Sequence, residues 1–176
     1  MSGLKRGSIA VVGAAESDLG QVAQHTTPVD LMAQATMRAL DDCGLKLKDV
    51  DGLFVAATQV RMGPMSLAEY LRIKPKVFDG TQIGGSSFMT HVAHAQMAIQ
   101  LGLCEVAVIA YGSTQRSVSR AAASPREFNP YESPYRPILP ISAYAMAAAR
   151  HMHQYGTTRE HLAEVAVAAR KWALMN

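Results

Sequence analysis

Apolar and polar positions alternate along this chain in blocks that have two kinds of spacing. Three short apolar runs, residues 8–12, 49–57 and 105–111, have the composition of buried β-strands. A further extended segment is expected over residues 76–83. The run 105–111 (EVAVIAY) is apolar on both faces, which predicts that it is the central strand of a sheet.

The segments between these runs have helical spacing. The first helix is expected to begin at Thr27, a candidate N-cap, with Pro28 at its first position and Asp30 at its third, where a carboxylate complements the helix dipole. Gly44 supplies a C-terminal stop. The residues expected on the inner face of this helix are Val29, Met32, Leu40 and Cys43.

Two more helices are expected before the second half of the chain. A short one, over residues 66–72, follows a break at Gly63 and Pro64. A long one, over residues 86–101, ends at Gly102. The alternation of strands and helices predicts an α/β fold in which strands pair in parallel.

The pattern changes over residues 113–140. This stretch contains five of the eight prolines and has little periodicity, so we expect a long loop or lid. Two helices, over residues 142–155 and 158–175, are predicted to follow it. The chain is therefore divided into a core (residues 1–112), the loop, and a helical continuation (residues 141–176).

The last predicted helix opens with Thr157 and Glu160 at capping-box spacing. Its inner face is expected to continue through Val165, Ala169 and Trp172. The chain stops at Asn176, in the last turn of this helix and without a stop signal. We therefore expect a fragment of a longer protein, or one half of a split one.

Composition narrows the class of protein. Of the 176 residues 49% are apolar and only 6% are aromatic, and the net charge of +3 comes from scattered Lys and Arg residues. No basic run marks a surface for nucleic acid or a membrane, and no apolar stretch is long enough to span one. Cys43 and Cys104 lack metal-ligand spacing and lie in apolar surroundings, so we expect reduced core cysteines in a cytoplasmic protein.

The most informative stretch is residues 81–117. It contains the end of an extended segment, a turn of Gly and Ser residues, the long helix and the strand-like run. Such a turn lets a ligand approach the backbone and directs unpaired helix N–H groups at it. Nucleophiles are often placed at helix starts, because the dipole lowers the pKa of a thiol and the amides stabilise an oxyanion.

This stretch resembles the thiolase superfamily, specifically its sterol-carrier-type and acetyl-CoA acetyltransferase-like branch. In that family a Cys-x-Ser-Gly motif opens the buried helix, which ends in Ile-x-x-Gly; residues 99–102 (IQLG) match this ending. Counting back places Gly85 at the position of the nucleophilic cysteine and Ser87 at that of the motif serine. Phe88 stands where the motif has its last glycine.

The resemblance covers nearly the whole chain and implies its architecture. Three segments match the family's first strand and loop, its second strand, and the helix after the loop: IAVVGAAESDLG, DVDGLFVAA and YAMAAARHMHQYGTT. The resemblance implies the N-terminal half of a layered αβαβα fold, with the loop as an insertion. It also implies a homodimer, and a coenzyme A thioester that is a substrate and not a permanently bound cofactor.

Departures from the family pattern bear on the chemistry. With Gly85 at the nucleophile position, a cysteine-dependent thiolase mechanism is not expected. The family's second-half motifs, a catalytic histidine and an acid/base Cys or His, do not occur in this chain. The isolated 176-residue chain is therefore expected to be inactive.

Three functional hypotheses follow. The first is an acyl-CoA-handling acyltransferase of lipid metabolism that does not depend on cysteine. The second is a cysteine-less retro-aldol lyase that cleaves a β-hydroxyacyl-CoA and works with an OB-fold partner protein; carbon–carbon cleavage by proton abstraction needs a base but no covalent acyl intermediate. The third is a non-catalytic subunit for acyl-CoA binding or assembly.

Ser86 and Ser87 are candidate substitute nucleophiles. A serine hydroxyl is a weak nucleophile without an adjacent base, and capping of the helix is the favoured interpretation of both. His91 and His94 share a helix face, but a metal site would need a third ligand nearby. We therefore expect no metal, and histidines that are polar core or interface residues.

The loop holds the candidate residues for coenzyme A. The resemblance implies that this region covers the active site, where Arg116, Arg126 and Arg136 would contact the phosphates, for which guanidinium groups are well suited. A solvated loop explains these arginines equally well. Cys104 follows the long helix instead of opening it, which favours structural burial.

Overall fold

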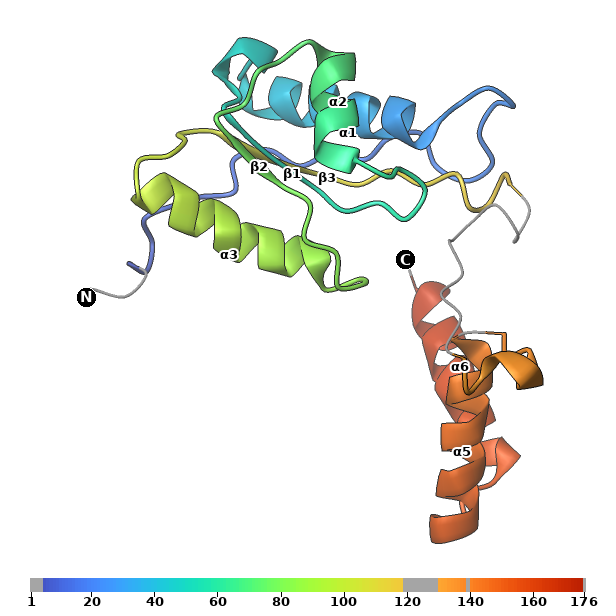
Figure 1. Ribbon diagram of the computed structural model, residues 1–176. Coiled ribbons are helices and arrows are strands. Elements are labelled where there is room, and N and C mark those ends of the chain that lie inside the picture. The colour runs from blue at the N-terminus through green and yellow to red at the C-terminus, as the bar shows by residue number, and fades with distance from the viewer. Residues whose placement is uncertain (1–4, 119–129, 139, 176) are drawn as a thin grey trace. The chain divides into compact units, whose positions relative to one another are not determined.

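The computed structural model of the chain describes residues 5–118, 130–138 and 140–175. They belong to two compact units, residues 1–125 and 126–176, and each unit is considered by itself. The first unit contains a small sheet with helices, and the second contains helices (Figure 1).

In the described residues of the first unit, the sheet has three parallel strands in the order β2-β1-β3. β1 is Gly52–Val55, β2 is Val77–Asp79 and β3 is Ala107–Ala110. Gly52 pairs with residue 77 of β2 and with residue 107 of β3. The predicted α/β class with parallel pairing is therefore correct.

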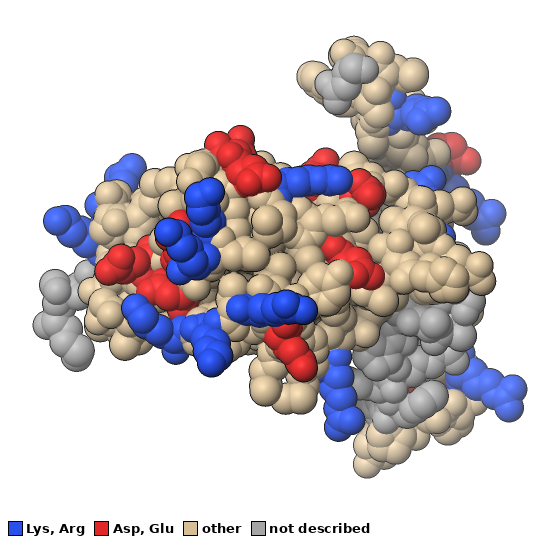
Figure 2. Space-filling view, turned by 90° about the horizontal axis from the view of Figure 1, so that it is seen from above, with Lys and Arg blue, Asp and Glu red and all other residues tan. Residues whose placement is uncertain are grey.

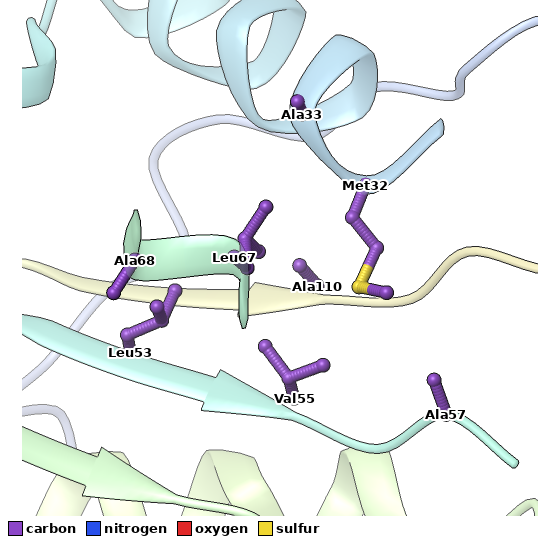
Figure 3. Packing of buried hydrophobic residues seen from close by; sticks show 8 residues of the cluster. All are labelled: Met32, Ala33, Leu53, Val55, Ala57, Leu67, Ala68 and Ala110. Carbon is purple, nitrogen blue, oxygen red and sulfur yellow. The ribbon is translucent and has the colours of Figure 1, made fainter. Parts of the chain in front are cut away.

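Helices cover both faces of this sheet (Figure 1). On one face lie α1 (Pro28–Cys43) and α2 (Gly63–Leu71), whose apolar side chains meet β1. Figure 3 shows this cluster from close by: Met32, Ala33, Leu53, Val55, Ala57, Leu67, Ala68 and Ala110. On the other face α3 (Ser87–Gln100) packs through Ala95 and Ala98 against Phe54 and Cys104.

Local sequence signals decide where α1 begins and ends. Thr27 is its N-cap, and the Thr27 hydroxyl accepts from the N–H of Asp30 at 3.2 Å while the Asp30 carboxylate accepts from the N–H of Thr27 at 2.8 Å. This reciprocal pair satisfies two N–H groups that a helix start otherwise leaves free. Gly44 ends the helix in the left-handed conformation, as predicted.

The strand predicted over residues 8–12 is wrong. This segment has no strand partner among the residues that the structure describes, and Val11 is 80% exposed. A strand exists only where its backbone finds a neighbouring backbone to bond, so an apolar run alone does not make one. At either side of this segment Gln100 donates to the carbonyl oxygen of Lys5 at 3.0 Å, and the N–H of Ala14 donates to Asp42 at 3.1 Å.

The prediction for the central strand is also wrong. β3 lies at an edge of the sheet and most of its residues are half-buried, whereas all four residues of β1 are buried between two neighbours. The run that is apolar on both faces therefore indicated a strand covered by helices, but it did not indicate the position of that strand in the sheet.

Other boundaries shift by a few residues. α2 begins at Gly63 with Pro64 in its first turn, so this pair opens the helix and does not precede it. Proline tolerates that position because the first N–H groups of a helix have no partner within it.

The second unit contains a 3₁₀ turn (Ser133–Tyr135), α5 (Ile141–Tyr155) and α6 (Arg159–Ala173). The cap of α6 lies one residue later than predicted: the N–H of Thr158 donates to Nδ1 of His161 at 3.1 Å, and Thr157 pairs instead with His151. The predicted inner face of α6 is not buried in the described residues, since Trp172 is 72% exposed.

Candidate functional site

The candidate site lies where the three parallel strands end. The segments that follow β1, β2 and β3 all leave the sheet at the carboxyl ends of the strands. Open parallel sheets place their ligand-binding groups at these ends. The segment after β2 forms the turn of residues 80–86 and leads directly into α3.

Two adjacent glycines of this turn differ in what they require. Gly84 has a φ of 78°, which an L side chain rarely adopts. Gly85 has no such φ, and a Cβ built on it would meet no atom within 4 Å. The position where the family carries its nucleophile is therefore sterically open to a side chain and holds a glycine without a backbone reason.

The two serines of the turn have different surroundings. The Ser87 hydroxyl is completely buried, accepts from the N–H of Ile83 at 2.9 Å and donates to the carbonyl oxygen of Gly84 at 2.7 Å. Ser86 is exposed and occupies the N-cap position, but its side chain makes no capping hydrogen bond. Ser87 is the first residue of α3 and bonds back to the turn, so the capping expected of the two serines is wrong for both. Ser87 therefore holds the turn closed, with its proton and one of its two lone pairs engaged by backbone groups.

His91 lies buried one turn further along α3. Its Nε2 is 3.0 Å from the carbonyl oxygen of Thr81, and its ring lies 5.9 Å from that of Phe54 and 6.2 Å from that of Phe88. Nε2 must carry a proton to donate to a carbonyl, and in the neutral ring this leaves Nδ1 as an acceptor. The buried Nδ1 has no hydrogen-bond partner among the described residues. His91 fixes the turn to the helix.

Asp79 and His94 form a pair between the end of β2 and α3. Nδ1 of His94 contacts one carboxylate oxygen of Asp79, and the other oxygen accepts from the N–H and the hydroxyl of Thr81, both at 2.7 Å. Burial disfavours the charged form of Asp79, but the hydrogen bonds from His94 and Thr81 outweigh it and lower the pKa of the carboxyl below its usual value. Each histidine therefore has a structural partner, as expected for polar core residues.

A glutamine joins the segments that follow β1 and β3. Oε1 of Gln59 accepts from the hydroxyl of Ser113 and the N–H of Thr114, each at 2.9 Å, and its Nε2 donates to the Thr114 hydroxyl at 3.2 Å. These bonds hold the start of the loop in which the exposed Arg116 lies. Neither Gln59 nor Asp79 was identified from the sequence, because polar residues just after strands are common and only their contacts distinguish these two.

The other candidate residues are dispersed. Arg136 is exposed and belongs to the second unit, and Arg126 lies outside the described residues. Cys104 is buried beside β1 and, like Cys43, has a free thiol, in agreement with the prediction. The role of the arginines at coenzyme A phosphates stays a prediction.

The part of the chain that the structure describes lacks two features, a metal-ligand cluster and a membrane-spanning helix. It contains no group of three His, Cys, Asp or Glu residues that could hold a metal ion. It also contains no helix long and apolar enough to cross a membrane. Figure 2 shows positive and negative side chains interspersed on one face of the molecule, without a continuous basic surface there.

Comparison with known proteins gives matches along nearly the whole chain. A 17-hydroxy-3-oxo-4-pregnene-20-carboxyl-CoA lyase from Mycobacterium tuberculosis is 30% identical over 97% of this chain and 46% of its own length. A steroid side-chain-cleaving aldolase from Thermomonospora curvata is also 30% identical, over the same shares. An acetyl-CoA acetyltransferase from Methanothermobacter thermautotrophicus is 29% identical over 90% of this chain and 43% of its own. The chain thus spans less than half the length of these relatives.

Solved structures agree with these matches. The Ltp2-ChsH2(DUF35) aldolase aligns with a TM-score of 0.59 and 27% identity, covering 85% of this chain and 40% of that one. OleA H285N from Xanthomonas campestris, which has the thiolase fold, aligns with a TM-score of 0.50 and 16% identity over 64% of this chain and 36% of that one. No protein-family model matches the chain.

Proposed function

Since this chain is a thiolase-like protein of the thiolase superfamily, we propose that the whole protein is a retro-aldol lyase acting on a β-hydroxyacyl-CoA. The observation that carries the proposal is the 30% identity, along 97% of the chain, to two proteins that are named as a carboxyl-CoA lyase and a side-chain-cleaving aldolase. An acyl-CoA lyase of this kind needs no nucleophilic cysteine.

The turn before α3 supports the same choice. Gly85 offers no nucleophile, and the buried Ser87 hydroxyl is occupied by two backbone groups. A ping-pong acyl transfer needs a group that forms a covalent acyl intermediate. A lyase needs instead a base and a site that stabilises an enolate.

The reaction balances without an external oxidant or reductant. A base removes the proton of the β-hydroxyl, the bond between the α and β carbons breaks, and the β carbon becomes a carbonyl. The electron pair of that bond forms the enolate of the thioester, which takes up a proton at the α carbon. N–H groups at the start of α3 are suited to an oxyanion of this kind.

The proposal includes a partner protein, and coenzyme A that enters as the thioester part of the substrate. The name of the aligned aldolase joins two proteins, Ltp2 and ChsH2(DUF35), which supports a partner protein for this one. An OB fold for that partner is taken from the family resemblance. A homodimer, a cytoplasmic location and contacts from Arg116, Arg126 and Arg136 to the phosphates remain parts of the proposal taken from the family resemblance.

The test uses the whole protein, with and without a partner of this kind. Incubation with a β-hydroxyacyl-CoA should release a carbonyl compound and a shortened acyl-CoA, both measured by liquid chromatography and mass spectrometry. Intact-mass spectrometry after incubation with acyl-CoA should show no covalent adduct. An acylated protein that transfers its acyl group, without cleavage products, would overturn the proposal.

Acyl transfer is the second candidate function. It is supported by the 29% identity to an acetyl-CoA acetyltransferase, and it shares with the first the expectation of a thioester substrate. The absence of a nucleophile at Gly85 makes it the less supported of the two.

A further inference from the structure

A hollow of about 790 Å³ lies at the amino ends of the three strands, whereas the candidate functional site lies at their carboxyl ends. It is lined by residues that precede β1 (45 and 47–51), β2 (73, 74 and 76) and β3 (105–106), together with the end of α2 (71–72). Its volume is within the range of small-molecule sites in proteins. The family resemblance assigned nothing to this place.

The lining of the hollow is partly apolar. Val50 is buried, and Leu71, Ile73 and Val106 are half-buried where they contribute to it. Apolar surface that stays accessible in a concave site favours a ligand with an apolar body.

Two of the three carboxylates of the hollow are already occupied. Oδ1 of Asp51 accepts from the N–H groups of Glu105 and Val106 at 2.8 and 2.9 Å, and its Oδ2 is 3.0 Å from Nζ of Lys76. Asp49 accepts from the N–H of Lys46 at 2.9 Å. The third carboxylate, that of Glu105, is exposed at the rim.

Three cations of the lining are without such partners in the part of the chain that the structure describes. Lys48, Arg72 and Lys74 are exposed, and in the described part of the chain none of them has an ion pair or a side-chain hydrogen bond. With Lys76, the lining has four cations against three carboxylates, which leaves an excess of one positive charge. The side chains that remain available therefore favour an anion.

Arg72 also has an unusual backbone. It ends α2 with a φ of 56°, the left-handed conformation that glycine usually supplies at a helix C-terminus. An arginine at such a position carries a strain that glycine would avoid, and strain of this kind is often found where a side chain has a function. This observation is independent of the charge and shape of the hollow.

From these observations we propose that the hollow binds an amphipathic organic anion, with its apolar body on Val50, Leu71, Ile73 and Val106 and its acidic head on Lys48, Arg72 and Lys74. A phosphate ester and a carboxylate share the chemistry that these cations recognise. The ligand would occupy a site separate from the edge where acyl-CoA chemistry is proposed.

The fluorescent anion 1-anilinonaphthalene-8-sulfonate is a suitable probe, because it joins an aromatic body to a single negative head. N-phenyl-1-naphthylamine has nearly the same body without the charge and serves as its neutral counterpart. In a titration of the 176-residue chain, the anion is expected to bind. Its affinity should fall roughly three- to fivefold in Arg72→Gly and about tenfold in Lys48→Met/Lys74→Met, since each removes charge but keeps the apolar lining.

Arg136→Gly is the matched control. Arg136 is an exposed arginine with a φ of 49° in the second unit, so its replacement removes the same charge from the same backbone conformation outside the hollow. It should leave the affinity for the anion unchanged. Arg72→Gly should not lower the melting temperature, because glycine suits the left-handed conformation, so a loss of binding would not reflect unfolding.

The outcomes decide the proposal. Weaker anion binding in the two hollow variants, with unchanged binding of the neutral probe and displacement by 1-naphthyl phosphate or 1-naphthoate, would support it, and the better competitor would identify the head group. The proposal would be overturned if the anion did not bind, or if wild type and hollow variants bound it equally well. It would also be overturned if the neutral probe lost affinity to the same extent, or if neither competitor displaced the anion.

Discussion

The hydroxyl of Ser87 donates a hydrogen bond of 2.7 Å to the carbonyl oxygen of Gly84, three residues earlier. Oγ of Ser87 in turn accepts from the N–H of Ile83 at 2.9 Å, so one buried hydroxyl closes the turn that starts α3. A residue that the thiolase resemblance marks as part of a catalytic motif thus has a structural task in this chain.

Replacing Ser87 by alanine should lower the free energy of unfolding by about 1–2 kcal/mol, because the N–H of Ile83 loses its acceptor in a partly buried turn. Ser86→Ala is the control, and it should change the value by less than about 0.5 kcal/mol since Ser86 is exposed and makes no capping bond. Urea unfolding of both variants measures the difference. Equal effects at the two positions would contradict the role given to Ser87.

Gly85→Cys should restore the family's nucleophile position with little cost in stability. A Cβ at Gly85 meets no atom within 4 Å, so we expect a change below about 0.5 kcal/mol in the free energy of unfolding. Gly84→Cys should cost about 1–2 kcal/mol, because Gly84 has a φ of 78°. Thermal and urea unfolding compare the two, and a Gly85→Cys protein as unstable as Gly84→Cys would refute the steric argument.

Gln59 should be important for the loop after β3. Gln59→Ala removes three hydrogen bonds and leaves Thr114 buried without them, so a loss of about 1–3 kcal/mol is expected. Gln59→Glu keeps the acceptor for Ser113 and for the N–H of Thr114 and should cost less. Faster hydrogen exchange around residues 113–118 in the alanine variant would support this; the same exchange in both variants would count against it.

Acid should destabilise the first unit through Asp51 and Asp79. For both, burial favours the neutral form, but hydrogen bonds outweigh it and the pKa of each carboxyl is below its usual value in the folded protein. The folded state therefore binds fewer protons than the unfolded state at low pH. The stabilisation is present above the unfolded pKa of about 4 and is lost as the pH falls through the lower folded value.

The measurement is the free energy of unfolding from about pH 6 down to about pH 2, a range that includes the usual pKa of a carboxyl group. Asp51→Asn should be less stable than wild type at neutral pH, and its stability should depend less steeply on pH below about 4. An unchanged slope would show that Asp51 does not contribute to the acid sensitivity.

Cys104 should be protected from alkylation in the folded protein. It is buried, and burial, followed by the charge of Asp51, raises the pKa of its thiol, so little thiolate is present near neutral pH. Treatment with iodoacetamide and mass spectrometry of the peptides should show modification of Cys104 only after unfolding. Rapid modification in the native protein would contradict its place beside β1.

Much of the local structure was predictable because its causes are local. Thr27, Pro28 and Asp30 define the start of α1 through contacts between neighbours in the chain, and the structure has that start at the predicted residue. The strands at residues 52–55, 77–79 and 107–110 lie within the predicted runs. Burial of Cys104 and the absence of a cysteine at position 85 could also be inferred from the sequence alone.

What depended on long-range contacts was not predictable. The run at residues 8–12 has a strand's composition but no strand partner, and β3 has a central strand's composition at an edge of the sheet. Strand pairing is a property of two segments, and the pattern within one segment does not contain it. The burial of α6 was not predictable either: periodicity indicated an inner face that includes Trp172, and Trp172 is exposed.

The sequence by itself therefore determined the class of fold, the family resemblance and the loss of the nucleophile at Gly85, because residue identity and spacing express them directly. Only the tertiary structure decided that Asp79 meets His94 and that Gln59 joins the segments after β1 and β3. It also brought Lys48, Arg72 and Lys74 to one hollow. Hydrogen bonds and charge clusters form between residues far apart in the chain, so their partners are set by how the strands and helices pack.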